Sequence, residues 1–214
     1  MLIDHTNKAL IYPNLNGGRL NTVSDIFDII GRIAFPIFAF LLVEGFFKTR
    51  SRAKYLATLL VFGVISEVPF DLFTTKQFFE PNWNNIMFTL ALMLVTIWMI
   101  DVVKKKMEKF PKILWFFLSF VILAVMCLIA AILSLDYDCH AILIGYFYYI
   151  FHGRELISIP FNFLSMYKEP WALLGFGLVL TYNGERGKQN KLINYLFYPV
   201  HLLILGLLRI YLGI

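Results

Sequence analysis

Residues 112–134 read KILWFFLSFVILAVMCLIAAILS, and their only charged residue is Lys112, at the very start. A helix needs about 20 consecutive apolar residues to cross a lipid bilayer, and this run is long enough. The whole chain of 214 residues is 59% hydrophobic and 15% charged, whereas soluble domains usually carry about 25% charged residues. The sequence therefore predicts an all-α, polytopic membrane protein that lies in the lipid bilayer.

Further apolar segments lie on either side of this run, separated by clusters of charge. Together they predict a transmembrane helical bundle of about nine membrane helices, some short or re-entrant, in a single integral membrane domain over 1–214. Pro69 is expected to end the third helix, because proline lacks the backbone N–H that a helix needs. The approximate helix ranges are 1–12, 25–47, 53–70, 85–103, 112–134, 139–151, 155–166, 170–182 and 191–213.

Basic residues gather in three short connections, at 48–54, 104–112 and 186–191. If the crossings alternate, all three connections fall on one side, and the positive-inside rule assigns that side to the cytoplasm. The net charge of +5 then reflects membrane topology, and no nucleic-acid partner is predicted. Cys127 and Cys139 form no spaced set, so neither a zinc site nor a disulfide framework is expected.

The N-terminal stretch MLIDHTNK places two ionisable side chains, Asp4 and His5, in a short helix that is expected to run outwards. At the rise of an α-helix, His5 and Arg32 lie at similar depths, about 12 Å and about 10 Å below the outer surface. Ionisable groups within a membrane are costly and are therefore functional candidates. A neutral histidine can also take and return a proton near pH 7. We therefore expect Asp4, His5 and Arg32 to meet inside the bundle.

Simple ion pairs remain an alternative for part of this group. Asp4 and Lys8 are spaced i,i+4, as are Asp28 and Arg32. Charged side chains with this spacing lie on the same face of a helix and can neutralise each other.

Other polar residues form a predicted secondary cluster. In SEVPFD (66–71), Asp71 is best interpreted as an interfacial cap, and Glu67 lies deeper. In the last helix, Lys191, Asn194, Tyr198 and His201 form one polar stripe, and Pro199 is expected to kink the helix beside His201. The predicted cluster consists of Glu67, Asn84, Asn85, Tyr198 and His201.

The stretch YNGERG, residues 182–187, is expected at the cytoplasmic end of the eighth helix. Asn-Gly favours a turn, and Arg186 with Lys188 places cations beside free backbone amides, where phosphates bind well. A positive-inside anchor is the alternative interpretation. The sequence has no GxSxG, HExxH, GxxxxGK[ST] or GxGxxG motif, so soluble-type hydrolase, zinc-protease and nucleotide-loop chemistry lack support.

Six stretches resemble, in order and spacing, the motifs of the TraX family, named for the F-pilin acetylation protein. The resemblance covers nearly the whole chain and implies a multi-pass protein of the bacterial cytoplasmic (inner) membrane. A family member is required for N-terminal acetylation of pilin. The family is also distantly similar to transmembrane acyltransferases, in which a membrane-embedded histidine serves acyl transfer from cytoplasmic acetyl-CoA. The matching histidine here is His5. The six stretches are IDH (3–5), IGRIAFPIFAFLLVEGFFKTRSRAKYL (30–56), ISEVPFDL (65–72), NNIMFTLAL (84–92), YNGERG (182–187) and FYPVHLLIL (197–205).

The residues and the resemblance together predict one mechanism. His5, oriented by Asp4, would act as general base on an amine or hydroxyl that enters from outside, or would carry the acyl group itself. Arg32, or Asn84 and Asn85, would stabilise the oxyanion. The residues expected to bind acetyl-CoA, with no metal, are Tyr182, Asn183, Arg186 and Lys188.

A non-enzymatic function is the alternative. A proton-coupled transporter or a membrane assembly factor would also use buried Glu67, His201 and Arg32. Inverted repeats, which are common in carriers, are not detectable in the sequence. The acceptor substrate and the formation of a homo-oligomer are left open.

Overall fold

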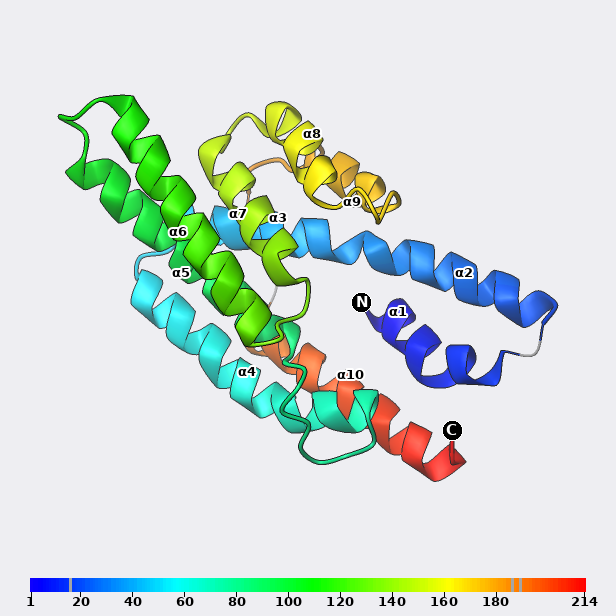
Figure 1. The fold of residues 1–214 in the computed structure, drawn as a ribbon. Helices are drawn as coiled ribbons and strands as arrows, with labels where there is room; N and C mark the ends of the chain where they lie inside the picture. The colour runs from blue at the N-terminus through cyan, green and yellow to red at the C-terminus, as the bar shows by residue number, and fades with distance from the viewer. Residues whose placement is uncertain (16, 186, 189) are drawn as a thin grey trace. The chain divides into compact units, whose positions relative to one another are not determined.

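A computed structural model describes residues 1–15, 17–185, 187–188 and 190–214 of the chain, and its regular elements are helices (Figure 1). Within these residues the only extended pairing is an isolated bridge between Asn84 and Leu135. The all-α prediction is therefore confirmed for this part of the chain. The elements are α1 (Leu2–Thr6), the π-helix η1 (Asn7–Ile11), the 3-10 helix η2 (Tyr12–Asn14), α2 (Arg19–Arg32), α3 (Ala34–Lys48), α4 (Arg52–Thr74), α5 (Ile86–Lys106), α6 (Lys112–Ile132), α7 (Asp138–Ile150), α8 (Glu155–Ser165), α9 (Ala172–Val179) and α10 (Lys191–Leu212).

Among the described residues, five helical stretches are long and apolar enough to cross a membrane, which supports the prediction of a membrane protein. They are Arg19–Lys48, Arg52–Thr74, Ile86–Lys106, Lys112–Ile132 and Leu192–Leu212. The other helices of the described residues are shorter: α7 has 13 residues, α8 has 11, α9 has 8, α1 and η1 have 5 each and η2 has 3. A full crossing takes about 20 residues. The predicted total of about nine membrane helices therefore stays a prediction.

The helix boundaries differ from the prediction at two prolines. Pro36 cannot donate to the carbonyl of Arg32, and α2 and α3 meet at Ile33, three residues before it. The expectation that Pro69 ends a helix is wrong, because α4 continues through it to Thr74. A proline inside a membrane helix costs one backbone hydrogen bond, which the surrounding helix tolerates. In the same way α10 continues through Pro199.

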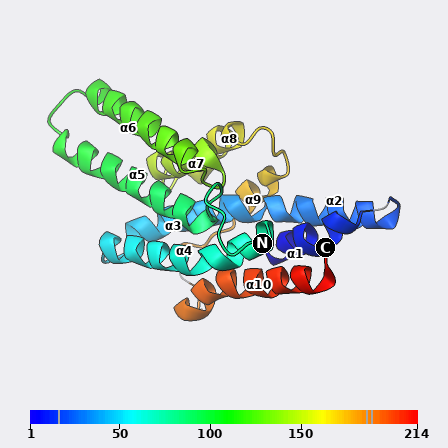
Figure 2. The ribbon, with the colours of Figure 1, turned by 60° about the horizontal axis from the view of Figure 1, so that its bottom comes forward.

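The chain divides into two compact units. Unit 1 comprises residues Met1–Ile37, Val61–Pro81 and Lys168–Ile214. Within it, α1 and η1 pack against both α2 and α10, and both views show α1 between these two helices (Figures 1 and 2). The Asn190 side chain caps the first turn of α10 by accepting from the Leu192 amide at 2.9 Å. The C-terminal part of α4, from Val61, also belongs to this unit.

Unit 2 comprises Phe38–Leu60 and Asn82–Tyr167. In this unit α5, α6 and α7 pack against one another, and α8 packs against α7. Asn85 is fully buried, and its Oδ1 accepts from the Met87 amide at 3.0 Å to cap α5. Asn84 donates from Nδ2 to the Leu133 carbonyl at 2.6 Å. These contacts fix the loop before α5, and the expected role of Asn84 and Asn85 as oxyanion donors stays a prediction.

Candidate functional site

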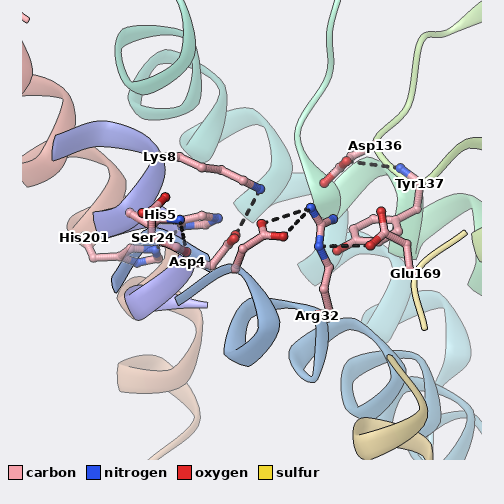
Figure 3. A network of polar contacts seen from close by, with 11 residues as sticks. Asp4, His5, Lys8, Ser24, Arg32, Asp136, Tyr137, Glu169 and His201 are labelled. Atoms are coloured by element: carbon pink, nitrogen blue, oxygen red, sulfur yellow. Dashed lines mark hydrogen bonds and ion pairs between the residues drawn. The ribbon is translucent and has the colours of Figure 1, made fainter. Parts of the chain in front are cut away.

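The side chains of His5 and His201 meet in unit 1. Nδ1 of His5 lies 2.7 Å from Nε2 of His201, and the two rings are stacked with centroids 5.0 Å apart (Figure 3). His5 comes from α1 and His201 from α10. His201 is 6% exposed, and His5 is half-buried. The structure thus joins the expected catalytic residue His5 to His201, a residue of the predicted secondary cluster.

The hydrogen bonds of this pair assign its tautomers. Nδ1 of His201 lies 2.5 Å from the Phe197 carbonyl. A carbonyl oxygen only accepts, so this nitrogen carries the hydrogen, and Nε2 of a neutral His201 is then an acceptor. His5 must therefore donate from Nδ1 to His201. With both rings neutral, Nε2 of His5 keeps a lone pair and is the basic nitrogen of the pair.

Aromatic rings surround the two histidines. The ring centroid of His5 lies 5.1 Å from that of Phe73 and 6.3 Å from that of Tyr198. The ring of Tyr198, which is 3% exposed, also lies edge-on to His201 at 5.8 Å, and Phe197 stacks on His201 at 4.9 Å. Such apolar neighbours limit the access of water, which strengthens electrostatic interactions at the imidazoles.

A close approach between α1 and α2 positions His5. A Cβ atom on Gly31 would lie 2.6 Å from Cβ of Asp4, so only glycine leaves room for the Asp4 side chain. Asn7, in η1, donates from Nδ2 to the Ser24 carbonyl of α2 at 3.0 Å. Single π-helical turns are rare and frequently occur at functional sites. The N-terminal helix is thus held against α2 at two positions, by Asp4 against Gly31 and by Asn7 against Ser24.

The seam between α1–η1 and α2 also contains two buried oxygens that accept no hydrogen bond from the described residues. They are Oδ1 of Asp4 and Oδ1 of Asn7. Asp4 is 9% exposed and Asn7 is 2% exposed. A buried acceptor without a donor is costly, so both oxygens are suited to take hydrogen bonds from a bound group. Sequence reasoning missed Asn7, and its one signal was a polar residue three positions after Asp4 in the same short helix.

The predicted role of Asp4 needs correction. Its Oδ2 accepts from Nζ of Lys8 at 3.1 Å (Figure 3), as the i,i+4 alternative predicted. The described hydrogen-bond partner of His5 is His201, so it is His201 and not Asp4 that orients the imidazole. The reason is helix geometry, since adjacent residues of a helix point in different directions.

Arg32 lies between two carboxylates. Its Nη2 is 3.1 Å from Oδ1 of Asp28, and its Nε is 3.1 Å from Oε2 of Glu169. The predicted ion pair with Asp28 is therefore present, and Glu169 adds a second one. Because two negative charges already offset the guanidinium, Arg32 would have to give up one partner to stabilise an oxyanion.

The C-terminal end of α4 carries further buried polar groups. Asp71 is 1% exposed inside α4, so it is not a cap at a helix end set by Pro69, as the sequence predicted; its Oδ2 accepts from the Glu80 amide of the following loop at 3.0 Å. Glu67 is half-buried on the same helix. Arg209 of α10 donates to the carbonyls of Phe73 and Thr74 at 2.8 and 3.0 Å. Sequence reasoning missed Arg209, whose only signal was a lone cation near the end of an apolar helix.

The predicted acetyl-CoA residues lie in the loop before α10. Oδ1 of Asn183 accepts from the Glu185 amide at 3.0 Å, and Gly184 has a positive φ of 79°, which confirms the predicted turn. Tyr182 is half-buried and Lys188 is exposed. Arg186 lies outside the described residues. The binding role of this loop stays a prediction.

Comparison with known proteins gives the chain a family. A family model described as "TraX protein" matches residues 1–209. The chain is also 35% identical over 104 residues to a probable fimbrial assembly protein, FimC of serogroup H1, from Dichelobacter nodosus. That match covers 45% of this chain and 40% of the relative, so the chain spans less than half of the relative's length. No solved structure matches the chain. The motif resemblance is thus confirmed, and the chain belongs to the TraX family.

Proposed function

We propose that this protein is a membrane-embedded acetyltransferase that moves an acetyl group from acetyl-CoA to an amine or hydroxyl. The observation that supports the proposal most strongly is the hydrogen bond between His5 and His201, which leaves Nε2 of His5 with a free lone pair. A histidine held in one tautomer by a second group is the usual arrangement of a general base. Apolar side chains would fill the space between these aromatic rings without the cost of burying polar imidazoles, so the pair is better explained by function than by packing.

In the proposed reaction Nε2 of His5 removes the proton of the acceptor's nucleophile as that atom attacks the thioester carbonyl. A new C–N or C–O bond forms, the C–S bond breaks, and the CoA thiolate leaves and regains the proton. After His5 takes the proton and before it returns it, the hydrogen bond from Nδ1 to His201 lets the two imidazoles share the positive charge. Direct transfer and passage through an acyl-histidine use the same residues.

The acceptor would bind at the seam between α1 and α2. Oδ1 of Asp4 and Oδ1 of Asn7 accept no hydrogen bond from the described residues, and either would accept an N–H or O–H of the substrate. The carboxylate of Asp4 also favours a cationic amine. Since the relative from Dichelobacter nodosus is named for fimbrial assembly, a pilin-like peptide is the acceptor that we propose to test first.

The proposed setting is the cytoplasmic membrane of a bacterium, with the basic connections in the cytoplasm. The five apolar helical stretches support a membrane location, and the basic residues of 48–54 and 104–112 support the orientation. Acetyl-CoA would then be drawn from the cytoplasm, and the acceptor would arrive from the outer side.

Transfer of labelled acetyl groups to a pilin-like peptide by the purified protein in lipid nanodiscs tests the proposal. His5→Gln should lower the rate by about 10²–10⁴-fold, the range expected for loss of a general base. His140→Gln is the matched control, because Nδ1 of His140 is bonded to the Ser165 carbonyl in unit 2 and has no proposed catalytic role. Wild-type protein that is neither stabilised by acetyl-CoA nor able to consume it would contradict the proposal and favour a carrier or assembly factor.

A further inference from the structure

One end of unit 2 holds several cations around two buried carboxylates. The first is Asp101 of α5, which is 6% exposed. It accepts from Arg52 at 2.6 Å, from Lys105 at 2.9 Å and from the Tyr149 hydroxyl at 3.1 Å. Arg52 also stacks on the ring of Phe46, with Cζ 3.9 Å from the centroid. The carboxylate therefore fixes two cations from two different helices.

The second carboxylate is Glu44 of α3, which is 7% exposed. Its Oε2 lies 2.6 Å from Nζ of Lys48, and its Oε1 lies 2.7 Å from Nε2 of His152. The ring of Phe47 stacks on His152 at 3.9 Å and on Tyr149 at 5.6 Å. These aromatic contacts link the two carboxylates into one cluster.

Lys104 differs from the other cations of the cluster. Its Nζ lies 5.4 Å from the ring centroid of Trp115 and 5.7 Å from that of Tyr149. No carboxylate pairs with it in the described part of the chain. Trp115 is 9% exposed, and its Nε1–H is buried without an acceptor among the described atoms. The ammonium of Lys104, an exposed residue, thus lies over the face of the indole, and neither it nor the buried indole N–H has an acceptor among the described residues.

We propose that Lys104 and the indole N–H of Trp115 bind a phosphate group, with Arg52 and Lys105 supplying further positive charge. A buried N–H normally has a hydrogen-bond partner, and a phosphate oxygen is a strong acceptor for both a neutral N–H and an ammonium. The cations in this cluster outnumber the two carboxylates, which suits a ligand with more than one negative charge. Two sources supply such a group: a soluble phosphorylated ligand, or the phosphate of an anionic lipid headgroup.

The soluble source connects this site with the proposed acetyltransferase, and this part of the inference rests on that function. CoA carries several phosphates, and the basic connections 48–54 and 104–112 are expected on the cytoplasmic side, where CoA is found. The cluster would then be the docking point of the acyl donor, in addition to or in place of the loop 182–188. Binding is measurable without turnover, so the two proposals fail independently.

The test measures CoA binding to the purified protein in nanodiscs of zwitterionic lipid. Lys104→Gln should weaken binding by about tenfold to a hundredfold, as expected for a charge-assisted hydrogen bond. Trp115→Phe removes only the N–H and should weaken binding by about threefold to tenfold. Two matched controls should leave the affinity unchanged. They are Lys109→Gln, in the same basic loop, and Trp171→Phe, in the turn before α9.

A lipid arm separates the two sources. The second measurement is native mass spectrometry of bound phosphatidylglycerol. The phosphate belongs to a lipid headgroup if Lys104→Gln and Trp115→Phe lose this lipid, the controls keep it, and none of the variants changes the affinity for CoA. If all lysine variants behave alike in both arms, the cluster is a general cationic anchor, and the proposal is overturned. A binding site that persists in a protein without transferase activity would support this inference and reject the acetyltransferase.

A measurement on the wild-type protein guards against misfolded variants. Addition of inorganic pyrophosphate should shift the ¹⁵N–¹H resonance of the Trp115 indole, because that N–H gains an acceptor. The indole resonance of Trp171 serves as the internal reference. An unchanged Trp115 resonance at saturating pyrophosphate and at saturating phosphatidylglycerol would overturn the proposal.

Discussion

Nδ1 of His5 and Nε2 of His201 lie 2.7 Å apart, although the two histidines are 196 positions apart in the chain. This bond gives each ring a defined role. His201 is anchored by the Phe197 carbonyl, and His5 is oriented by His201. A change at His201 should therefore act through His5.

The first prediction concerns this dependence. His201→Phe keeps an aromatic ring but removes the acceptor for Nδ1 of His5, so the acetyl-transfer rate at saturating acetyl-CoA should fall by about tenfold to a hundredfold. The pH dependence of the rate should change as well, since the pair no longer shares a proton. Phe197→Leu is the control, because it keeps the carbonyl that anchors His201 and should cost far less. Equal losses in both variants would mean that the pair is only a packing feature.

The second prediction tests the close approach of α1 to α2. In Gly31→Ala the new Cβ would overlap Asp4, with 2.6 Å to its Cβ, so α1 should shift and move His5 away from His201. We expect a large loss of transfer activity in a protein that still inserts and binds acetyl-CoA. Gly177→Ala is the control, because a Cβ there meets nothing within 4 Å. Full activity in Gly31→Ala would show that the position of α1 does not matter.

The third prediction concerns stability. Arg209→Met leaves two carbonyls, those of Phe73 and Thr74, without their side-chain donor. A hydrogen bond that involves a charged group contributes about 1.5–3 kcal/mol, so the midpoint of thermal unfolding in detergent should fall by several degrees. Arg19→Met, an exposed residue at the start of α2, should have little effect. If both variants unfold at the wild-type temperature, the Arg209 contacts do not contribute to the fold.

The fourth prediction concerns topology. In a cysteine-free background, Lys106→Cys should resist an impermeant thiol reagent in intact cells, because the loop 104–112 is expected in the cytoplasm. Phe79→Cys, at a position 72% exposed and expected outside, should be labelled. Labelling of position 106 before lysis would reverse the proposed orientation and the side from which CoA enters.

Much of the fold follows from local sequence. Runs such as 112–134 have too few polar groups to lie in water and too many residues to form a short buried helix, so they predict membrane helices. Asn85 and Asn190 each cap the helix that follows them, because their side chains accept from backbone amides two residues ahead. Such signals depend on residues within a few turns of each other. The sequence therefore indicated the helices, the turn at Asn183 and the histidines as candidates.

The partners of the candidate residues were decided by tertiary structure alone. Depth estimates place His5 and Arg32 at one level, but they do not say which way each side chain points around its helix. In the structure Arg32 turns to Asp28 and Glu169, Asp4 turns to Lys8, and His5 meets His201. Likewise, whether Pro69 ended its helix depended on the rest of the helix and its surroundings, and not on the proline itself. Hydrophobic pattern determines which segments are helices, whereas the rotation and packing of those helices determine which polar groups become neighbours.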